Sequence, residues 1–244
     1  SFDQTSKILE HISQNDKPQT RKTSLSGLFV LTGDDKYQEQ MGKDIKIVND
    51  NYKERKMSPE RKLQMKTPEE LKTITDDLIA KYKKSKNSED LNNVVISVLM
   101  SGVYVPPRRL EYALVKTRDF NKKTDNYIVK QKIYLNQYKT VAKYGQQIVE
   151  LPKEIMTYIN KAVKTNESGF LLETKVGKAY TSSSLSKKLT ALFGMGADLL
   201  RSSYINYNLY DDNLLQKLEN TAEAMGNSVE SQKKYYVKSN LDEQ

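Results

Sequence analysis

Apolar residues recur at helical spacing in two consecutive blocks between positions 67 and 101. The first block is preceded by Thr67 and Pro68, with Glu70 three residues after the threonine, an order typical of a capping box at a helix start. The second block spans about 90–101 and stops at Gly102. The sequence therefore predicts two amphipathic helices here. Their apolar positions are Leu71, Ile74, Leu78, Ile79 and Tyr82 in the first, and Leu91, Val94, Val95, Val98 and Leu99 in the second.

The pattern changes after residue 116. Residues 127–138 and 146–151 are rich in β-branched and aromatic side chains and flank a turn that contains Gly145, which predicts a small antiparallel sheet. Helical spacing then returns in four segments. We expect one helix opened by Pro152, one capped by Ser182 or Ser183 and ending at Gly194, one over about 199–207, and one over about 212–225 that ends at Gly226.

The first 66 residues differ from the rest. They contain short helical patterns separated by Gly27, Gly33 and Gly42, and a run of charge from Lys53 to Lys66 ends the section. We expect two parts, a small helical module with a linker over 1–66 and a larger domain over 67–244. The fold class predicted is mainly α with a small antiparallel β-sheet, an α+β arrangement.

Composition excludes several classes of protein. No stretch approaches the ~18 apolar residues of a membrane span. The first twenty residues lack the basic start and apolar run of a secretory signal, so we expect an intracellular protein and not a secreted one. The chain begins with Ser1 and not Met, which predicts that preceding residues have been removed.

Charge points toward a polyanionic partner. The formal net charge is +9. The segment from Lys116 to Lys143 contains eight basic residues but only two acidic ones, Asp119 and Asp125, and four aromatic residues lie among them. Such a surface suits a phosphate backbone, although a solvated face of a lysine-rich protein fits equally well. The aromatic residues are Phe120, Tyr127, Tyr134 and Tyr138.

The residues available for catalysis narrow the chemistry further. With no cysteine and only His11, neither a Cys–His nor a Ser–His–Asp set is expected, and neither is a zinc site. The sequence also shows no metal-ligand motif and no glycine-rich nucleotide-binding loop, so we expect no other metal and no nucleotide cofactor. Tyrosine, arginine and lysine remain. That set suffices for attack of a phenolate on a phosphodiester while guanidinium groups neutralise the phosphate oxygens.

Five short motifs occur in an informative order. Arg108-Arg109-Leu110-Glu111 follows the second helix, and Tyr138-Lys139-Thr140 closes a strand before the turn at 141–145. Leu200-Arg201-Ser202-Ser203-Tyr204, then Met225-Gly226-Asn227-Ser228, then Tyr236 nine residues after Asn227 complete the series. Over about 67–238 this order resembles the tyrosine recombinase (phage integrase) family, with a context closer to integrases of large DNA viruses, virophages and related mobile elements than to bacterial ones.

The resemblance implies a DNA breaking-rejoining catalytic core preceded by a helical core-binding module. It implies that Tyr236 attacks the scissile phosphate to form a 3′-phosphotyrosyl link, with Tyr235 as the alternative nucleophile. Arg108 and Arg201 would clamp the phosphate, and Lys139, or alternatively Lys143, would act as the general acid. Double-stranded DNA is the implied partner, bound by a homotetramer in a synapse, with no small-molecule substrate and no membrane. The implied location is wherever that target DNA lies, in host cytoplasm, nucleus or virus factory.

Two positions depart from the family pattern. Asp198 stands where the family usually has histidine, and Asn227 stands where it has histidine or tryptophan. Asp198 can accept the phenol proton and Asn227 can still donate a hydrogen bond, so we keep both as catalytic candidates. Two other readings stay open: a relaxing enzyme similar to type IB topoisomerases, and a catalytically weakened DNA-binding descendant of the fold. A helical protein-binding scaffold is less well supported, since five motifs would then coincide by chance.

Overall fold

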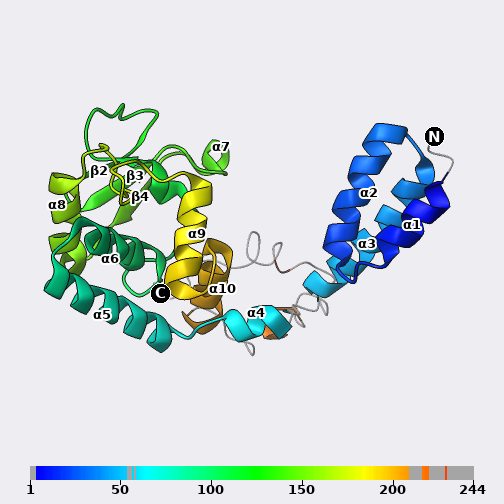
Figure 1. Ribbon diagram of the computed structural model, residues 1–244, viewed down its shortest axis with the longest axis horizontal. Coiled ribbons are helices and arrows are strands. Elements are labelled where there is room, and N and C mark those ends of the chain that lie inside the picture. Colours follow the sequence, from blue (N-terminus) through cyan, green and yellow to red (C-terminus); the bar gives the residue numbers. More distant parts are fainter. Residues whose placement is uncertain (1–3, 54–56, 58, 209–215, 220–228, 230–244) are drawn as a thin grey trace, which may run out of the picture. The chain divides into compact units, whose positions relative to one another are not determined.

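The computed structural model describes residues 4–53, 57, 59–208, 216–219 and 229. The chain divides into two compact units, Ser1–Leu63 and Gln64–Gln244. This division falls three residues before the boundary expected after residue 66. The first unit contains α1 (Thr5–Ser13), α2 (Pro18–Thr32) and α3 (Asp35–Lys53), and α4 (Pro59–Gln64) lies at the division (Figure 1).

The first unit is a small helical assembly with few buried side chains. Only Gly33, with φ of 70°, separates two helices, whereas Gly27 and Gly42 lie inside α2 and α3. The expectation that all three glycines separate helices was wrong, because a glycine within a helix costs only about 1 kcal/mol and longer helices absorb it. The buried Asp44 carboxylate of α3 pairs with Arg21 of α2.

The second unit begins with the predicted capping box, which is confirmed. The Thr67 hydroxyl accepts from the Glu70 backbone N–H at 3.2 Å, and the Glu70 carboxylate accepts from the Thr67 N–H at 2.7 Å. Helix α5 (Pro68–Ser85) follows. Helix α6 (Ser88–Met100) starts two residues earlier than expected, with Asn87 as its cap, and is buried from Asp90 to Met100. Helices α5, α8 (Met156–Thr165) and α9 (Ser182–Phe193) pack around α6, which makes it the centre of the core.

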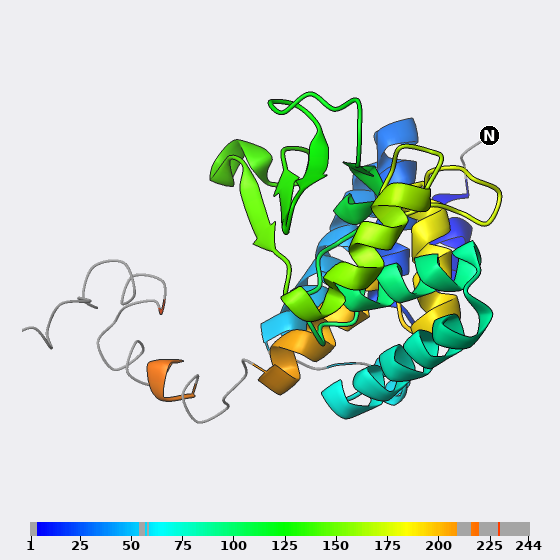
Figure 2. The same cartoon turned by 90° about the vertical axis from the view of Figure 1, so that its left-hand side faces the viewer.

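The sheet has four strands in the order β1 (Val115–Lys116), β2 (Asn126–Val129), β3 (Lys132–Leu135) and β4 (Gln147–Glu150). β1 is parallel to β2 and the other pairs are antiparallel, so the sheet is mixed and not purely antiparallel. The segment 127–138, expected as one strand, is two strands joined by a turn in which Lys130 has φ of 53°. In Figure 2 these strands project from one side of the helices of this unit.

Alternation in the strands places two kinds of residue on the two faces of the sheet. Ile128, Ile133 and Leu135 belong to the hydrophobic core. Tyr127 and Tyr134 lie on the opposite face, where Phe120, Tyr127 and Tyr134 form a stacked row with ring centroids 4.5 and 4.7 Å apart.

The remaining elements complete the second unit. Two short 3₁₀ helices are η1 (Glu111–Leu114) and η2 (Lys153–Ile155). Pro152 directly precedes η2 and opens the η2–α8 segment, as expected. Thr181, not Ser182 or Ser183, caps α9, because its hydroxyl accepts from the Ser184 N–H. Helix α10 (Ala197–Asn208) matches the helix expected over 199–207. Most of the helix expected over 212–225 lies outside the described residues.

Among the helices in the described ranges, none has the length and apolar character needed to cross a membrane.

Candidate functional site

Three of the predicted catalytic residues line one pocket of about 250 Å³ in the second unit. Arg108 comes from the segment before η1, Lys139 from the turn before α7 (Val141–Tyr144), and Arg201 from α10. The full lining is Pro107, Arg108, Arg109, Glu111, Tyr138, Lys139, Thr140, Tyr144, Gln147 and Arg201. Segments that are far apart in the chain therefore bring their cations to the same cavity.

Arg108 is held against an aromatic ring. Its guanidinium carbon lies 5.3 Å from the centroid of the Tyr138 ring, within the range of a cation–π contact. Its Nε is buried and has no hydrogen-bond partner among the residues that the structure describes. Within the described part of the chain, no carboxylate forms an ion pair with Arg108. The guanidinium thus keeps hydrogen-bonding capacity for an anionic ligand.

Tyr138 also anchors the turn that carries Lys139. Its hydroxyl donates to the backbone oxygen of Gly145 at 2.6 Å, which closes the segment around α7. β3 ends at Leu135, so Lys139 lies in a turn after the strand and not at the end of the strand as expected. The reason is that residues 136–140 turn away from the ladder before α7 begins. Lys139 is exposed and lines the pocket, whereas the alternative general acid, Lys143, is on α7 with its Nζ 5.1 Å from the Tyr144 ring centroid.

Helix α10 supplies the second arginine. Arg201 is half-buried and lines the pocket. Asp198 lies in the first turn of the same helix, three positions earlier, and is exposed, but it is not among the lining residues. Asn227, Tyr235 and Tyr236 lie outside the described residues. The structure therefore brings together Arg108, Lys139 and Arg201.

The pocket is strongly positive. Its lining contains four cationic side chains and a single carboxylate, that of Glu111. The cations are Arg108, Arg109, Lys139 and Arg201. Such an excess, with guanidinium groups that can donate in pairs, is suited to a phosphate group. Among the described residues, no group of three or more His, Asp or Glu side chains is placed to hold a metal ion.

One tyrosine, Tyr112, lies buried close to Arg108. Tyr112 is fully buried, and this burial raises the pKa of its phenol well above the usual value, although nearby Arg108 partly opposes the shift. The Tyr112 hydroxyl therefore stays protonated at neutral pH.

Sequence reasoning missed part of the pocket lining. Arg109, Thr140, Tyr144 and Gln147 contribute to it. Arg109 was signalled by its place beside Arg108, and Tyr138 and Thr140 by the motif that they form with Lys139. The contributions of Tyr144 and Gln147 depend on how the α7 segment folds back toward β4, which residue spacing does not reveal.

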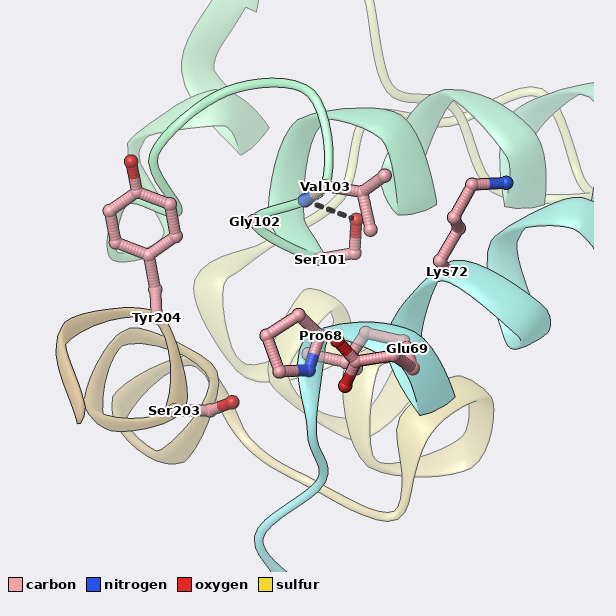
Figure 3. Close-up of a pocket in the computed structure, with 9 residues that line it drawn as sticks. Pro68, Glu69, Lys72, Ser101, Gly102, Val103, Ser203 and Tyr204 are labelled. Carbon is pink, nitrogen blue, oxygen red and sulfur yellow. Dashed lines mark hydrogen bonds between the residues drawn. The ribbon is translucent and has the colours of Figure 1, made fainter. Parts of the chain in front are cut away.

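A second pocket of about 240 Å³ lies between the start of α5, the end of α6 and α10. Figure 3 shows Tyr204 of α10 beside the Gly102–Val103 backbone, with Ser101 accepting a hydrogen bond from the Val103 N–H. None of the predicted catalytic residues lines this pocket.

Comparison with known proteins finds no matching family model, no matching curated protein and no matching solved structure.

Proposed function

We propose that the pocket binds the scissile phosphate of double-stranded DNA and that the protein is a tyrosine-recombinase-like DNA strand transferase. One observation carries this proposal: Arg108, Lys139 and Arg201, chosen from sequence motifs alone, line the same positive pocket. Two guanidinium groups and an ammonium group can neutralise the charge of a phosphate during transfer without a metal ion. Unrelated surface cations from the three motifs would line one pocket only by coincidence.

The proposed reaction uses residues of this chain only. The Tyr236 hydroxyl oxygen attacks phosphorus and its proton passes to Asp198. The bond from phosphorus to the 5′-oxygen breaks, and Lys139 donates a proton to that oxygen. Arg108 and Arg201 neutralise the non-bridging oxygens, with a hydrogen bond from Asn227 in support. The 5′-hydroxyl of a DNA strand reverses the step, because the phosphotyrosyl bond conserves the energy of the broken bond.

The charge distribution supports DNA as the partner. The net charge of +9 and the basic segment 116–143 favour association with a phosphate backbone, independent of sequence. We propose site-specific recombination or integration by a homotetramer on two duplexes. Relaxation of supercoiled plasmid without recombination at defined sites would instead indicate a topoisomerase.

The test is covalent trapping on a nicked suicide duplex, drawn from a pool rich enough to contain the target site. The product of strand cleavage diffuses away, and the protein–DNA adduct is resolved on a denaturing gel and its peptide mapped. We expect an adduct at Tyr236 that Tyr236→Phe abolishes without loss of DNA binding. Mapping to Tyr235 would move the nucleophile by one residue.

Arg201→Ala tests the clamp. We expect cleavage to fall about 100- to 1000-fold, while DNA affinity falls less than about tenfold, since many phosphate contacts share the affinity. Arg118→Ala is the matched control, because Arg118 is an exposed arginine of the basic segment that does not line the pocket. Equal losses of binding and cleavage in Arg201→Ala would contradict the clamp. DNA binding without any adduct in the wild type would favour the inactive descendant.

A further inference from the structure

Asn126 occupies an unusual position beside the pocket. It is the first residue of β2 and is fully buried. Its side-chain oxygen accepts from the backbone N–H groups of Asn136 and Gln137, at 2.8 and 2.7 Å. Its side-chain nitrogen donates to the backbone oxygens of Gln137 and Glu111, at 3.0 and 3.3 Å. All four bonds therefore go to backbone groups in two other segments.

Those two segments carry pocket cations. Glu111 lies three residues after Arg108, and Gln137 lies two residues before Lys139. Tyr138, which lies between Gln137 and Lys139 in the sequence, places its ring against Arg108. The Asn126 carboxamide is thus a direct link from the backbone of the Arg108 segment to the backbone of the Lys139 turn. A buried amide with all of these bonds made is costly to replace, because backbone groups would lose their partners.

We propose that Asn126 is a positioning residue that fixes the separation between Arg108 and Lys139. The inference rests on the proposed function in one respect only: that this separation matters because the two cations act on one phosphate. Asn126 does not touch the substrate. It acts through the backbone segments that it joins.

Asn126→Asp is the principal variant, since it keeps the size and the acceptor oxygen but removes the amide donor to Glu111 and Gln137. Asn126→Ala removes all four bonds. The matched control is Asn136→Asp. The Asn136 amide also donates to two backbone oxygens, those of Lys122 and Asp125 at 3.1 and 2.7 Å, but neither belongs to the Arg108 segment.

The first readout compares two leaving groups on the duplex that gives the wild-type adduct. One substrate has the normal 5′-oxygen, and the other has sulfur at that position, which leaves as a thiolate and needs little protonation because a thiol pKa is about 8.5. If Asn126 positions the general acid, Asn126→Asp should slow cleavage of the oxygen substrate about 100-fold and of the sulfur substrate less than about tenfold. Equal slowing of both would overturn the proposal.

The second readout does not depend on catalysis. The chain has no cysteine, so Arg109→Cys and Thr140→Cys, both at exposed positions, can carry a pair of nitroxide labels in the 244-residue chain. The spin–spin broadening should report a narrow distribution of distances between the two labels in the doubly labelled chain without further change and in Asn136→Asp. It should report a wider distribution in Asn126→Asp and Asn126→Ala. An unchanged separation in the Asn126 variants would overturn the inference.

These two readouts separate the two ideas. If the wild type forms no adduct, the proposed function fails and the labels alone decide whether Asn126 positions the segments. If the adduct forms but the labels show no change, the function stands and the role of Asn126 falls. Thermal unfolding identifies variants that do not fold, and failure of both Asn126 variants to fold would make this a residue of general stability and contradict the proposal.

Discussion

Buried polar atoms without partners cluster in the Arg108 segment. The Nε of Arg108, one carboxylate oxygen of Glu111 and the hydroxyl of Tyr112 are all buried and lack a hydrogen bond within the described structure. Each such group typically costs about 1–3 kcal/mol. Native proteins retain few of them, and a bound ion or a role in catalysis is among the reasons for keeping one. Arg108 lines the pocket, so a phosphate bound there would supply the acceptor that its Nε lacks, whereas the Glu111 oxygen is itself an acceptor and would need a donor.

A carboxylate elsewhere in the second unit is fully partnered by contrast. Asp90, near the start of α6, is 4% exposed. Lys81 lies 2.9 Å from one of its oxygens, and the Ser85 hydroxyl donates to the other at 2.6 Å. These hydrogen bonds, together with the charge of Lys81, lower the pKa of Asp90 despite its desolvation.

The lowered pKa of Asp90 predicts a pH-dependent stability. A carboxylate with a lower pKa in the folded than in the unfolded state stabilises the fold fully above the unfolded value, about 3.9, and loses this contribution as the pH falls through the folded value. We expect Asp90→Asn to reduce the free energy of unfolding by about 1–2 kcal/mol at pH 7 and by less below about pH 4. Urea titrations at both pH values measure this. Asp77→Asn, at an exposed position of α5, is the control; a deficit for Asp90→Asn that did not vary with pH would contradict the assignment.

Helix ends were predictable where local chemistry determines them, and strands were less so. The Thr67 capping box and the stop of α9 at Gly194 follow from residues within one turn of each end. The two-strand structure of 127–138 depends on a left-handed conformation at Lys130, a residue type that gives little signal for a turn. The parallel β1–β2 pairing joins segments separated by a loop, so its direction depends on tertiary packing.

The candidate site shows the same division. The motifs gave Arg108, Lys139 and Arg201 from their order along the chain, and all three line the pocket. Asn126 gave no signal, because its role depends on four backbone groups that become its neighbours only after the sheet forms.

At the level of elements, Gly102 is where α6, the Arg108 segment and α10 meet. Its φ is 84°, and a Cβ there would lie 2.9 Å from a Tyr204 ring carbon and 3.4 Å from a Pro107 side-chain carbon. Tyr204 is one turn after Arg201 on α10, and Pro107 directly precedes Arg108. A side chain at position 102 would therefore push on both elements that carry the arginines.

Gly102→Ala should be more damaging than an ordinary glycine replacement. We expect a loss of about 2–4 kcal/mol, which combines the strain of a positive φ with the steric overlap. Gly194→Ala is the matched control, because Gly194 has φ of 69° but no atom within 4 Å of the added Cβ, so it isolates the backbone strain. Urea denaturation gives both values. Equal losses in the two variants would mean that Tyr204 and Pro107 move aside without cost.

At the level of the whole molecule, the two units differ in how much apolar surface they bury. In the described part of the first unit, Leu25 and Tyr37 are the buried hydrophobic residues, while Val30 and Leu31 of α2 are 80% and 78% exposed. The second unit has one continuous core that runs from Leu71 to Leu200. Hydrophobic burial is the main favourable term in folding, so the two units should differ in stability.

This difference predicts that the first unit unfolds before the second. A unit of this size with so small a core is expected to contribute less than about 5 kcal/mol of stability. Hydrogen exchange of the full chain at increasing urea, read by mass spectrometry of peptides, should show α2 and α3 losing protection at a lower urea concentration than α5 and α6. The buried Arg21–Asp44 pair offers a check, since Asp44→Asn should lower the midpoint of the α2–α3 peptides and leave the α5–α6 peptides unchanged. A single common midpoint that moves as one in Asp44→Asn would instead show that the two units unfold as one cooperative structure.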